Sequence, residues 1–376
     1  MNPICSRCAL RLQRAATSDS IQAGRRAFSQ TITKRKGGVP AFTKTSSPEL
    51  DAKLADIRAK HFIPAYLNHH DRRLIFGTKH KQSLEDNPQT ATIGKEEIDL
   101  NWIDRRSEVP NGKKLVKEII NLSAEHDEWQ NLPNLLVGLK HSRHTPSPER
   151  MEEIIRKAVE QGRIGIIVQC LQQAERTGMT LRTGKVMRSV MWGLHQTAQM
   201  DNWSEESVTK ALKNASQVAL LLETEVHSTG GSTGSSSAPW DAKRRPENVA
   251  VFLELEAVNA YKFHNGVDVN GKVKMYAERL LKCIGDIPEK TKPRSHAPAP
   301  RGPQFEMLHG VPIWHGLTLA QKILSPNMPQ AEFANQIIAE YQTSLSALAK
   351  AIEEKSPKEG TYNAQALSVW KDCIRD

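Results

Sequence analysis

The apolar residues of this chain recur at helical spacing in paired segments, and the pairs themselves repeat along the chain. Within 163–177 the spacing between successive apolar positions alternates between one and three residues, which places them on one face of an amphipathic helix. We expect helix pairs at 112–123 with 128–140, 148–161 with 163–177, and 182–199 with 204–226. The pairs begin at 112, 148 and 182, that is 36 and then 34 residues apart. This period predicts an all-α fold, a helical-hairpin repeat (α-solenoid) in which each hairpin buries its open face on the next.

The remaining sequence after the repeats alternates linker-like and helical composition. Gly/Ser-rich segments behave as flexible coils, and closely spaced prolines exclude a helix. The expected order is helical-hairpin repeats at 112–226, a Gly/Ser linker at 227–248, a further helical hairpin at 249–285, a Pro-rich basic linker at 286–304 and a C-terminal helical cap at 305–376.

The first 28 residues hold five arginines and a single acid, Asp19, among small and hydroxylated residues. This composition is typical of a mitochondrial presequence, and the order Arg-Ala-Phe-Ser at 26–29 predicts cleavage after Phe28. We therefore expect a presequence at 1–28 and a mature protein in the mitochondrial matrix. The alternative is a disordered basic arm that stays on the mature protein.

Residues 29–111 are expected to form a basic, extended N-terminal arm that carries a small β-hairpin around Gly94. Within 58–81, six lysines and arginines and three aromatic residues accompany Asp71 as the one acid. Cationic side chains contact phosphates and aromatic rings stack on unpaired bases, so this composition favours RNA binding. A second basic cluster lies at 140–150, between the first two hairpins. The candidate RNA-binding residues are Arg58, Lys60, Arg72, Arg73, Lys79, Lys81, Lys140 and Arg143. The alternative is a solvated basic surface whose aromatics anchor it to the helical body.

The clearest repeat unit runs over 151–181, with Ala158 on its first helix, Gly162 at the turn and Gly178 at the close of the second helix. In these positions the unit resembles a pentatricopeptide repeat. The alternatives are a chance helical hairpin and a tetratricopeptide-like array. The presequence, basic arm and helical body are also similar in style to proteins of fungal mitochondrial ribosomes. The second resemblance implies that rRNA and mitochondrial ribosomal proteins are the partners.

No enzyme motif fits its context in this sequence. The segment from Gly178 to Lys185 approaches a phosphate-binding loop, but five residues separate its glycines where four are needed, and Val186 replaces the hydroxyl that would hold magnesium. The five cysteines are too scattered for a four-ligand zinc site, and no apolar run reaches the length of a membrane span. We therefore expect no enzyme activity, no cofactor, no metal, no small-molecule substrate and no membrane span.

The charge balance favours a polyanionic partner, because 52 lysines and arginines stand against 42 acids. The expected function is a non-enzymatic component of the mitochondrial ribosome that binds rRNA and neighbouring proteins. One alternative is a factor for mitochondrial mRNA stability or translation. A second alternative, from a different class, is a protein-binding assembly scaffold for a respiratory complex that binds no nucleic acid.

Overall fold

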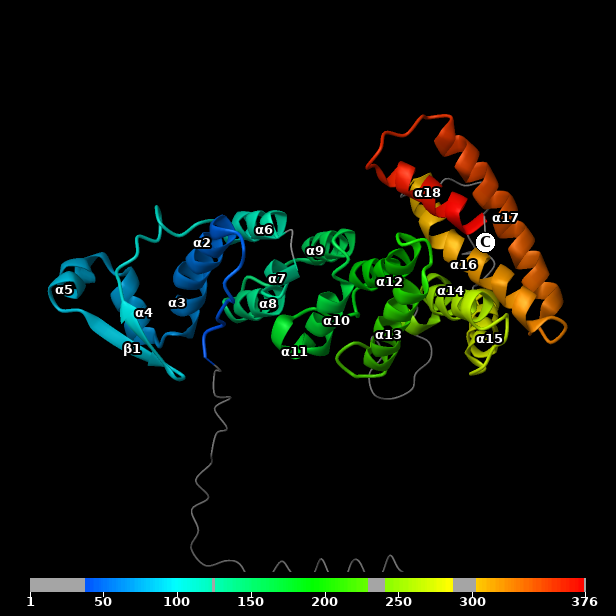
Figure 1. Cartoon of the computed structure of the whole chain (residues 1–376). Helices are drawn as coiled ribbons and strands as arrows, with labels where there is room; N and C mark the ends of the chain where they lie inside the picture. The colour runs from blue at the N-terminus through cyan, green and yellow to red at the C-terminus, as the bar shows by residue number, and fades with distance from the viewer. Residues whose placement is uncertain (1–37, 124–125, 229–240, 287–301, 375–376) are drawn as a thin grey trace, which may run out of the picture. The chain divides into compact units, whose positions relative to one another are not determined.

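The computed structural model of the chain describes residues 38–123, 126–228, 241–286 and 302–374. Over these residues the chain is mostly helical and contains one two-stranded sheet (Figure 1), which confirms the all-α class. The expected presequence at 1–28 lies outside the described residues. So do residues 229–240 of the expected Gly/Ser linker and residues 287–301 of the expected Pro-rich linker.

The N-terminal part of the described chain is helical, so the expectation of an extended arm is wrong for residues 48–86. The elements are α2 (Pro48–Ile57), η1 (Arg58–Phe62, a π-helical turn), α3 (Ile63–Tyr66), α4 (His69–Phe76), η2 (Thr78–His80) and α5 (Lys81–Asp86). Leu50, Leu54 and Ile57 lie three or four positions apart on one face of α2 and are buried. The Ser47 side chain caps this helix by accepting from the N–H of Leu50. The burial of this apolar stripe stabilises helices in spite of the surrounding charge.

The few residues before α2 run without regular secondary structure along α8 (Leu132–His141) and are held there by side-chain amides. Asn131 accepts hydrogen bonds from the backbone N–H and the hydroxyl of Thr43 at 2.8 and 3.0 Å. Its Nδ2 donates to the carbonyl of Thr43 at 2.9 Å, and Asn134 donates to the carbonyl of Ala41 at 2.8 Å. These side chains therefore satisfy backbone groups that would otherwise need a neighbouring strand.

The predicted β-hairpin is confirmed. Strands β1 (Gln89–Ile93) and β2 (Glu96–Leu100) pair antiparallel, with Ile93 opposite Glu96 at the turn. Gly94 adopts a φ of 67° there, a conformation that costs glycine little.

The central helices pair along the chain and also pack on helices of the next pair. They are α6 (Gly112–Leu122), α7 (His126–Trp129), α8, α9 (Pro148–Glu160), α10 (Ile164–Gln172), α11 (Ala174–Thr177), α12 (Gly184–Gln199) and α13 (Glu205–Leu222). Helix α9 packs on α12, α10 packs on α13, and α8 packs on α10 and α11. Gly193 allows the close approach of α12 to α9, since a Cβ there would lie 2.5 Å from Val159.

The C-terminal helices surround α16, which Figure 1 shows between α14 and α17. The elements are η3 (Ala242–Arg244), α14 (Pro246–Phe263), α15 (Lys272–Gly285), α16 (Pro303–Leu324), α17 (Ala331–Glu353) and α18 (Tyr362–Ile374). Gly316 of α16 touches the backbone of α14, because a Cβ there would lie 3.1 Å from the nitrogen of Glu254. None of the described helices combines the length and apolarity that crossing a membrane requires.

Candidate nucleic-acid interface

Four of the predicted RNA-binding residues are exposed on α4, η2 and α5, and we call them the α4–α5 basic surface. They are Arg72, Arg73, Lys79 and Lys81. The opposite side of the same short helices is buried through Leu74, Ile75 and Leu84, so the helices point the cations outward. Among the described residues, none of the four is paired with a carboxylate. Their charges are therefore available to an external anion.

Aromatic rings accompany this surface. The ammonium of Lys81 lies 4.8 Å from the centre of the Trp102 ring, and the guanidinium of Arg105 lies 5.0 Å from the centre of the Phe76 ring. Arg105 is exposed and Trp102 is half-buried. Sequence reasoning missed Arg105 and Trp102, which follow the hairpin. The one signal was a tryptophan close to two arginines in an irregular stretch.

Arg58 and Lys60 are half-buried and each is paired with a carboxylate of the chain, which sets them apart from the exposed cations. Arg58 donates to both carboxylate oxygens of Glu96 at 2.6 and 2.7 Å, and its Nε donates to the carbonyl of Pro40 at 3.1 Å. Lys60 lies 2.7 Å from the carboxylate of Asp56, one helical turn before it. Arg58 thus ties η1 to the β-hairpin, and both cations already have a carboxylate partner.

Lys140 also has a structural task, whereas Arg143 is exposed. The ammonium of Lys140 donates to the carbonyls of Ala174 and Glu175 in α11, a favourable position for a cation near a helix C-terminus. Arg143 follows α8 with a φ of 62° and lies on the surface.

The two basic segments of the sequence meet where α8 ends. The rings of His61 and His144 lie edge to face with centres 5.2 Å apart, and those of Tyr66 and His141 have centres 3.9 Å apart. We call Arg143, His144 and His61 the α8-end cluster. Burial lowers the pKa of His61, and the neighbouring His144 lowers it further, so His61 is neutral at neutral pH.

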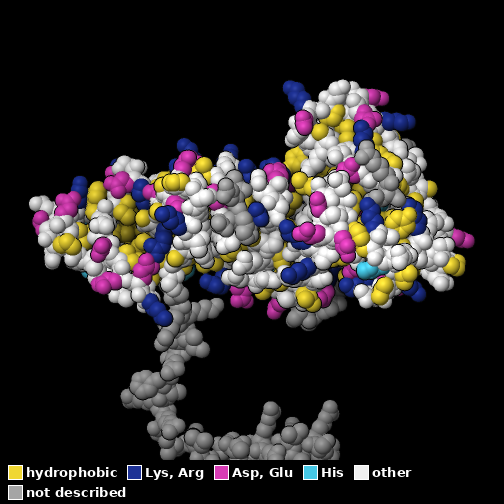
Figure 2. All heavy atoms as spheres, in the orientation of Figure 1, with side chains coloured by type: hydrophobic (Ala, Val, Ile, Leu, Met, Phe, Trp, Pro, Cys, Tyr) yellow, Lys and Arg dark blue, Asp and Glu magenta, His cyan; other side chains and the backbone are white. Residues whose placement is uncertain are grey.

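Charge on the visible face of the molecule is mixed. Figure 2 shows Lys and Arg side chains lying among Asp and Glu side chains over the described helices. On this face the cations are therefore interspersed with carboxylates.

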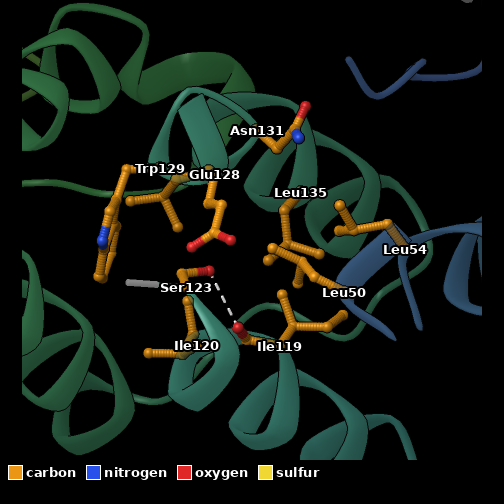
Figure 3. Close-up of a pocket in the computed structure, with 10 residues that line it drawn as sticks. Leu50, Leu54, Ile119, Ile120, Ser123, Glu128, Trp129, Asn131 and Leu135 are labelled. Carbon is orange, nitrogen blue, oxygen red and sulfur yellow. Dashed lines mark hydrogen bonds between the residues drawn. The ribbon is translucent and has the colours of Figure 1, made fainter. Parts of the chain in front are cut away.

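One small pocket lies between α2, α6 and α8 (Figure 3). Figure 3 shows the carboxylate of Glu128 pointing toward Ser123 among leucine and isoleucine side chains, and the Ser123 hydroxyl donates to the carbonyl of Ile119 at 2.9 Å. The cavity has a volume of about 10 Å³, the space of a single water molecule. It is too small for a metabolite, so this pocket is part of the core.

Comparison with known families places this helical, locally cationic chain among the proteins of the mitochondrial ribosome. The matching family is described as mitochondrial ribosomal protein mS27, its model matches residues 26–372, and the chain belongs to that family. The small ribosomal subunit protein mS27 of Neurospora crassa is 26% identical over 271 residues, which cover 68% of this chain and 68% of the relative.

Family membership confirms the expected function and location. The chain is a component of the mitochondrial ribosome and resides in the mitochondrial matrix. The two alternatives, an mRNA-stability or translation factor and an assembly scaffold for a respiratory complex, are therefore set aside.

Proposed function

We propose that this ribosomal protein binds rRNA through the α4–α5 basic surface, with the exposed Arg143 of the α8-end cluster as a second contact. The supporting observation is that four exposed cations on three consecutive short elements have no carboxylate partner in the described chain. Trp102 and Phe76 lie under neighbouring cations and hold them in place. Arg58 acts indirectly, because its pairing with Glu96 holds β2, which packs on α4. Lys60 and Lys140 are engaged with Asp56 and with the carbonyls of α11.

We further propose a non-enzymatic role within the small subunit, as the name of the Neurospora relative indicates. The helices would serve as a scaffold for rRNA and neighbouring ribosomal proteins. The family supports this role, since its description names a ribosomal protein.

We also infer that residues 112–226 form the helical-hairpin repeats, of pentatricopeptide-like or related type, with 249–285 as a further hairpin and 305–376 as a cap. The support is the packing of α9 on α12 and of α10 on α13, since first helices contact first helices and second helices contact second helices. The left-handed glycines Gly162 and Gly178 lie at the ends of helical segments, as such turns require.

The test reverses the α4–α5 basic surface by changing Arg72, Arg73, Lys79 and Lys81 to Glu together. If the four residues contact phosphates, the variant should bind a small-subunit rRNA fragment more weakly. The slope of log K against the logarithm of the salt concentration should become shallower by roughly 3. Filter binding at several salt concentrations measures both quantities. Sedimentation of mitochondrial lysate should show less of the variant with the small subunit.

The matched control reverses four exposed lysines elsewhere on the chain: Lys210, Lys213, Lys350 and Lys355. This control changes the net charge by the same amount and should retain most of the RNA affinity. Equal losses in both variants would mean that only net charge matters, and no loss in the first variant would contradict the proposed RNA surface. Circular dichroism should show that both variants keep their helices.

A further inference from the structure

Two of the three aromatic residues of 58–81 face the core of the protein. Phe62 is fully buried, and its ring fills the space beside Gly138 of α8. Tyr66 is 9% exposed, and the centre of its ring lies 3.9 Å from that of His141. A nucleic-acid base stacks on the open face of an aromatic ring, so neither residue can receive one.

The other two rings near the α4–α5 basic surface are covered by cations. The guanidinium of Arg105 lies over the ring of Phe76, and the ammonium of Lys81 lies over the ring of Trp102. Both rings are half-buried and pack against the core, and the Nε1 atom of Trp102 is buried. A base could therefore stack on either ring only by displacing a cation that would otherwise attract its phosphate.

The exposed aromatic side chains of the described chain lie in its C-terminal helices. They are Tyr261 of α14 and Tyr362 of α18, which are 38% and 50% exposed. Each also has a cation over its ring, Lys322 at 5.0 Å and Arg156 at 6.0 Å from the ring centre. Within residues 38–123, therefore, no aromatic ring is open to a base.

The frame that carries the four cations is fixed by buried contacts. Leu74 and Ile75 of α4 and Leu84 of α5 are buried on the side opposite the cations. The N–H of Ile103, after β2, donates to the carbonyl of Ile75 at 2.8 Å and ties α4 to the segment that follows the hairpin. Gly77 leaves no room for a side chain at the turn after α4, since a Cβ there would lie 2.7 Å from a backbone carbonyl oxygen of the helix. The backbone positions of the cations are thus set before any ligand binds.

We propose that the α4–α5 basic surface binds double-helical rRNA through its phosphates, and not unpaired rRNA; this inference rests on the proposed function. Binding of a single strand without sequence preference combines phosphate contacts with stacking of the bases on aromatic rings. The surface supplies the first contribution without the second. An A-form helix is bound by its shape and by contacts to phosphates and 2′-hydroxyls, which need no stacking.

Charge density and order favour the duplex as well. A duplex presents the phosphates of two strands along one axis, so a surface of four cations meets more phosphates than it would on one strand. The phosphates of a duplex are also held at a fixed spacing. A single strand loses conformational freedom when it is bound and gains no stacking here in return. A fixed array of cations is therefore complementary to the fixed array of phosphates.

The test compares three nucleic-acid probes on the full chain by fluorescence anisotropy at one salt concentration. The probes are an RNA duplex of about 20 base pairs, an oligouridine with the same total number of phosphates, and a strand of that length with tetrahydrofuran spacers in place of its nucleosides. The duplex should bind at least about tenfold more tightly than the oligouridine. The oligouridine and the base-free strand should bind within about twofold of each other, because no ring receives a base.

The variant with Arg72, Arg73, Lys79 and Lys81 changed to Glu separates this inference from the proposed function. It should lose most of the affinity for the duplex, whereas the control with four reversed lysines elsewhere should keep both the affinity and the preference for the duplex. If the fourfold variant bound the duplex as tightly as the wild-type chain, the proposed RNA surface would itself be wrong, and this inference would fail with it.

Two results from the wild-type chain would overturn the inference alone. One is an oligouridine bound as tightly as the duplex, and the other is an oligouridine bound about tenfold more tightly than the base-free strand. If the fourfold variant then lost the affinity for oligouridine, the RNA surface would stand and its ligand would be unpaired RNA. Both comparisons use the wild-type chain, so they decide the question even if the variant does not fold.

Discussion

Replacing Gly138 with alanine should destabilise the protein, because the ring of Phe62 occupies the space that a side chain at 138 needs. A Cβ at that position would lie 2.1 to 2.4 Å from three carbon atoms of the ring. Ordinary carbon contacts are about 3.5–4.0 Å, so either the ring or the helix must shift. Phe62 is fully buried, so its ring cannot swing out into solvent. This contact joins α8 to η1, the element between α2 and the helices of the α4–α5 basic surface.

The expected magnitude follows from two opposing effects. Alanine in a helix interior is favoured over glycine by about 1 kcal/mol. Overpacking a buried site costs typically about 1–3 kcal/mol, and overlap with three ring atoms belongs at the upper end of this range. We therefore expect Gly138→Ala to lower the free energy of unfolding by about 2 kcal/mol.

The assay is urea denaturation of the full chain, followed by tryptophan fluorescence and by circular dichroism. The matched control is Gly165→Ala on α10, where a Cβ meets nothing closer than Asn214 at 3.9 Å. Because this site has room, the control should be neutral or stabilised by up to about 1 kcal/mol.

The double variant Phe62→Leu with Gly138→Ala tests the stated cause. Leucine frees space at the contact, so the double variant should be more stable than the sum of the single changes predicts, by about 1 kcal/mol or more. The reasoning is refuted if Gly138→Ala is as stable as Gly165→Ala, or if the two changes at the contact are simply additive.

Two further predictions concern buried hydrogen bonds. Burial lowers the pKa of His227 below its ordinary value of 6.5, and its Nδ1 accepts from the N–H of Leu181 while its Nε2 donates to the carbonyl of Leu171. The folded state favours the neutral form of the ring. The stability that His227 contributes should therefore be fully present above about pH 6.5 and be lost as the pH falls below that value. Melting temperatures at pH 7.5 and 5.5 should differ less in His227→Gln, and an unchanged difference would argue against this role. Asn131→Ala removes three hydrogen bonds to Thr43 and should lower the free energy of unfolding by about 1–3 kcal/mol. A protease should also cleave the segment that precedes α2 faster than in the wild-type chain. Unaltered protease resistance would count against the amide contact.

Helix positions in the central part could be read from the sequence, because the relevant pattern is local. On α9, Ile154, Ile155 and Ala158 are buried at the spacing of one helical face, and Ser147 caps the helix by accepting from the N–H of Arg150. The same local pattern is present at Leu50 and Leu54, which lie four residues apart on one face of α2. This stripe predicts a helix where the basic composition of 29–111 suggests an extended arm, and the structure has the helix.

The state of each cation depended on contacts between residues far apart in the chain. Arg58 and Arg72 are alike in sequence context, yet Arg58 is paired with Glu96, which lies 38 residues away, while Arg72 is exposed. Whether either arginine contacts RNA stays a prediction.

The sequence alone determines that the molecule is basic. It also determines where the helices begin and which faces they bury, because side chains three or four positions apart on a helix interact independently of the tertiary structure. Helix packing alone decided which buried polar groups meet. Glu254 lies 59 residues from His195 and 61 from His315. His315 reaches Glu254 because Gly316 lets α16 approach the backbone of α14, and His195 reaches it because α12 also packs on α14. Contacts over such separations depend on the relative placement of whole helices, and no local spacing encodes that placement.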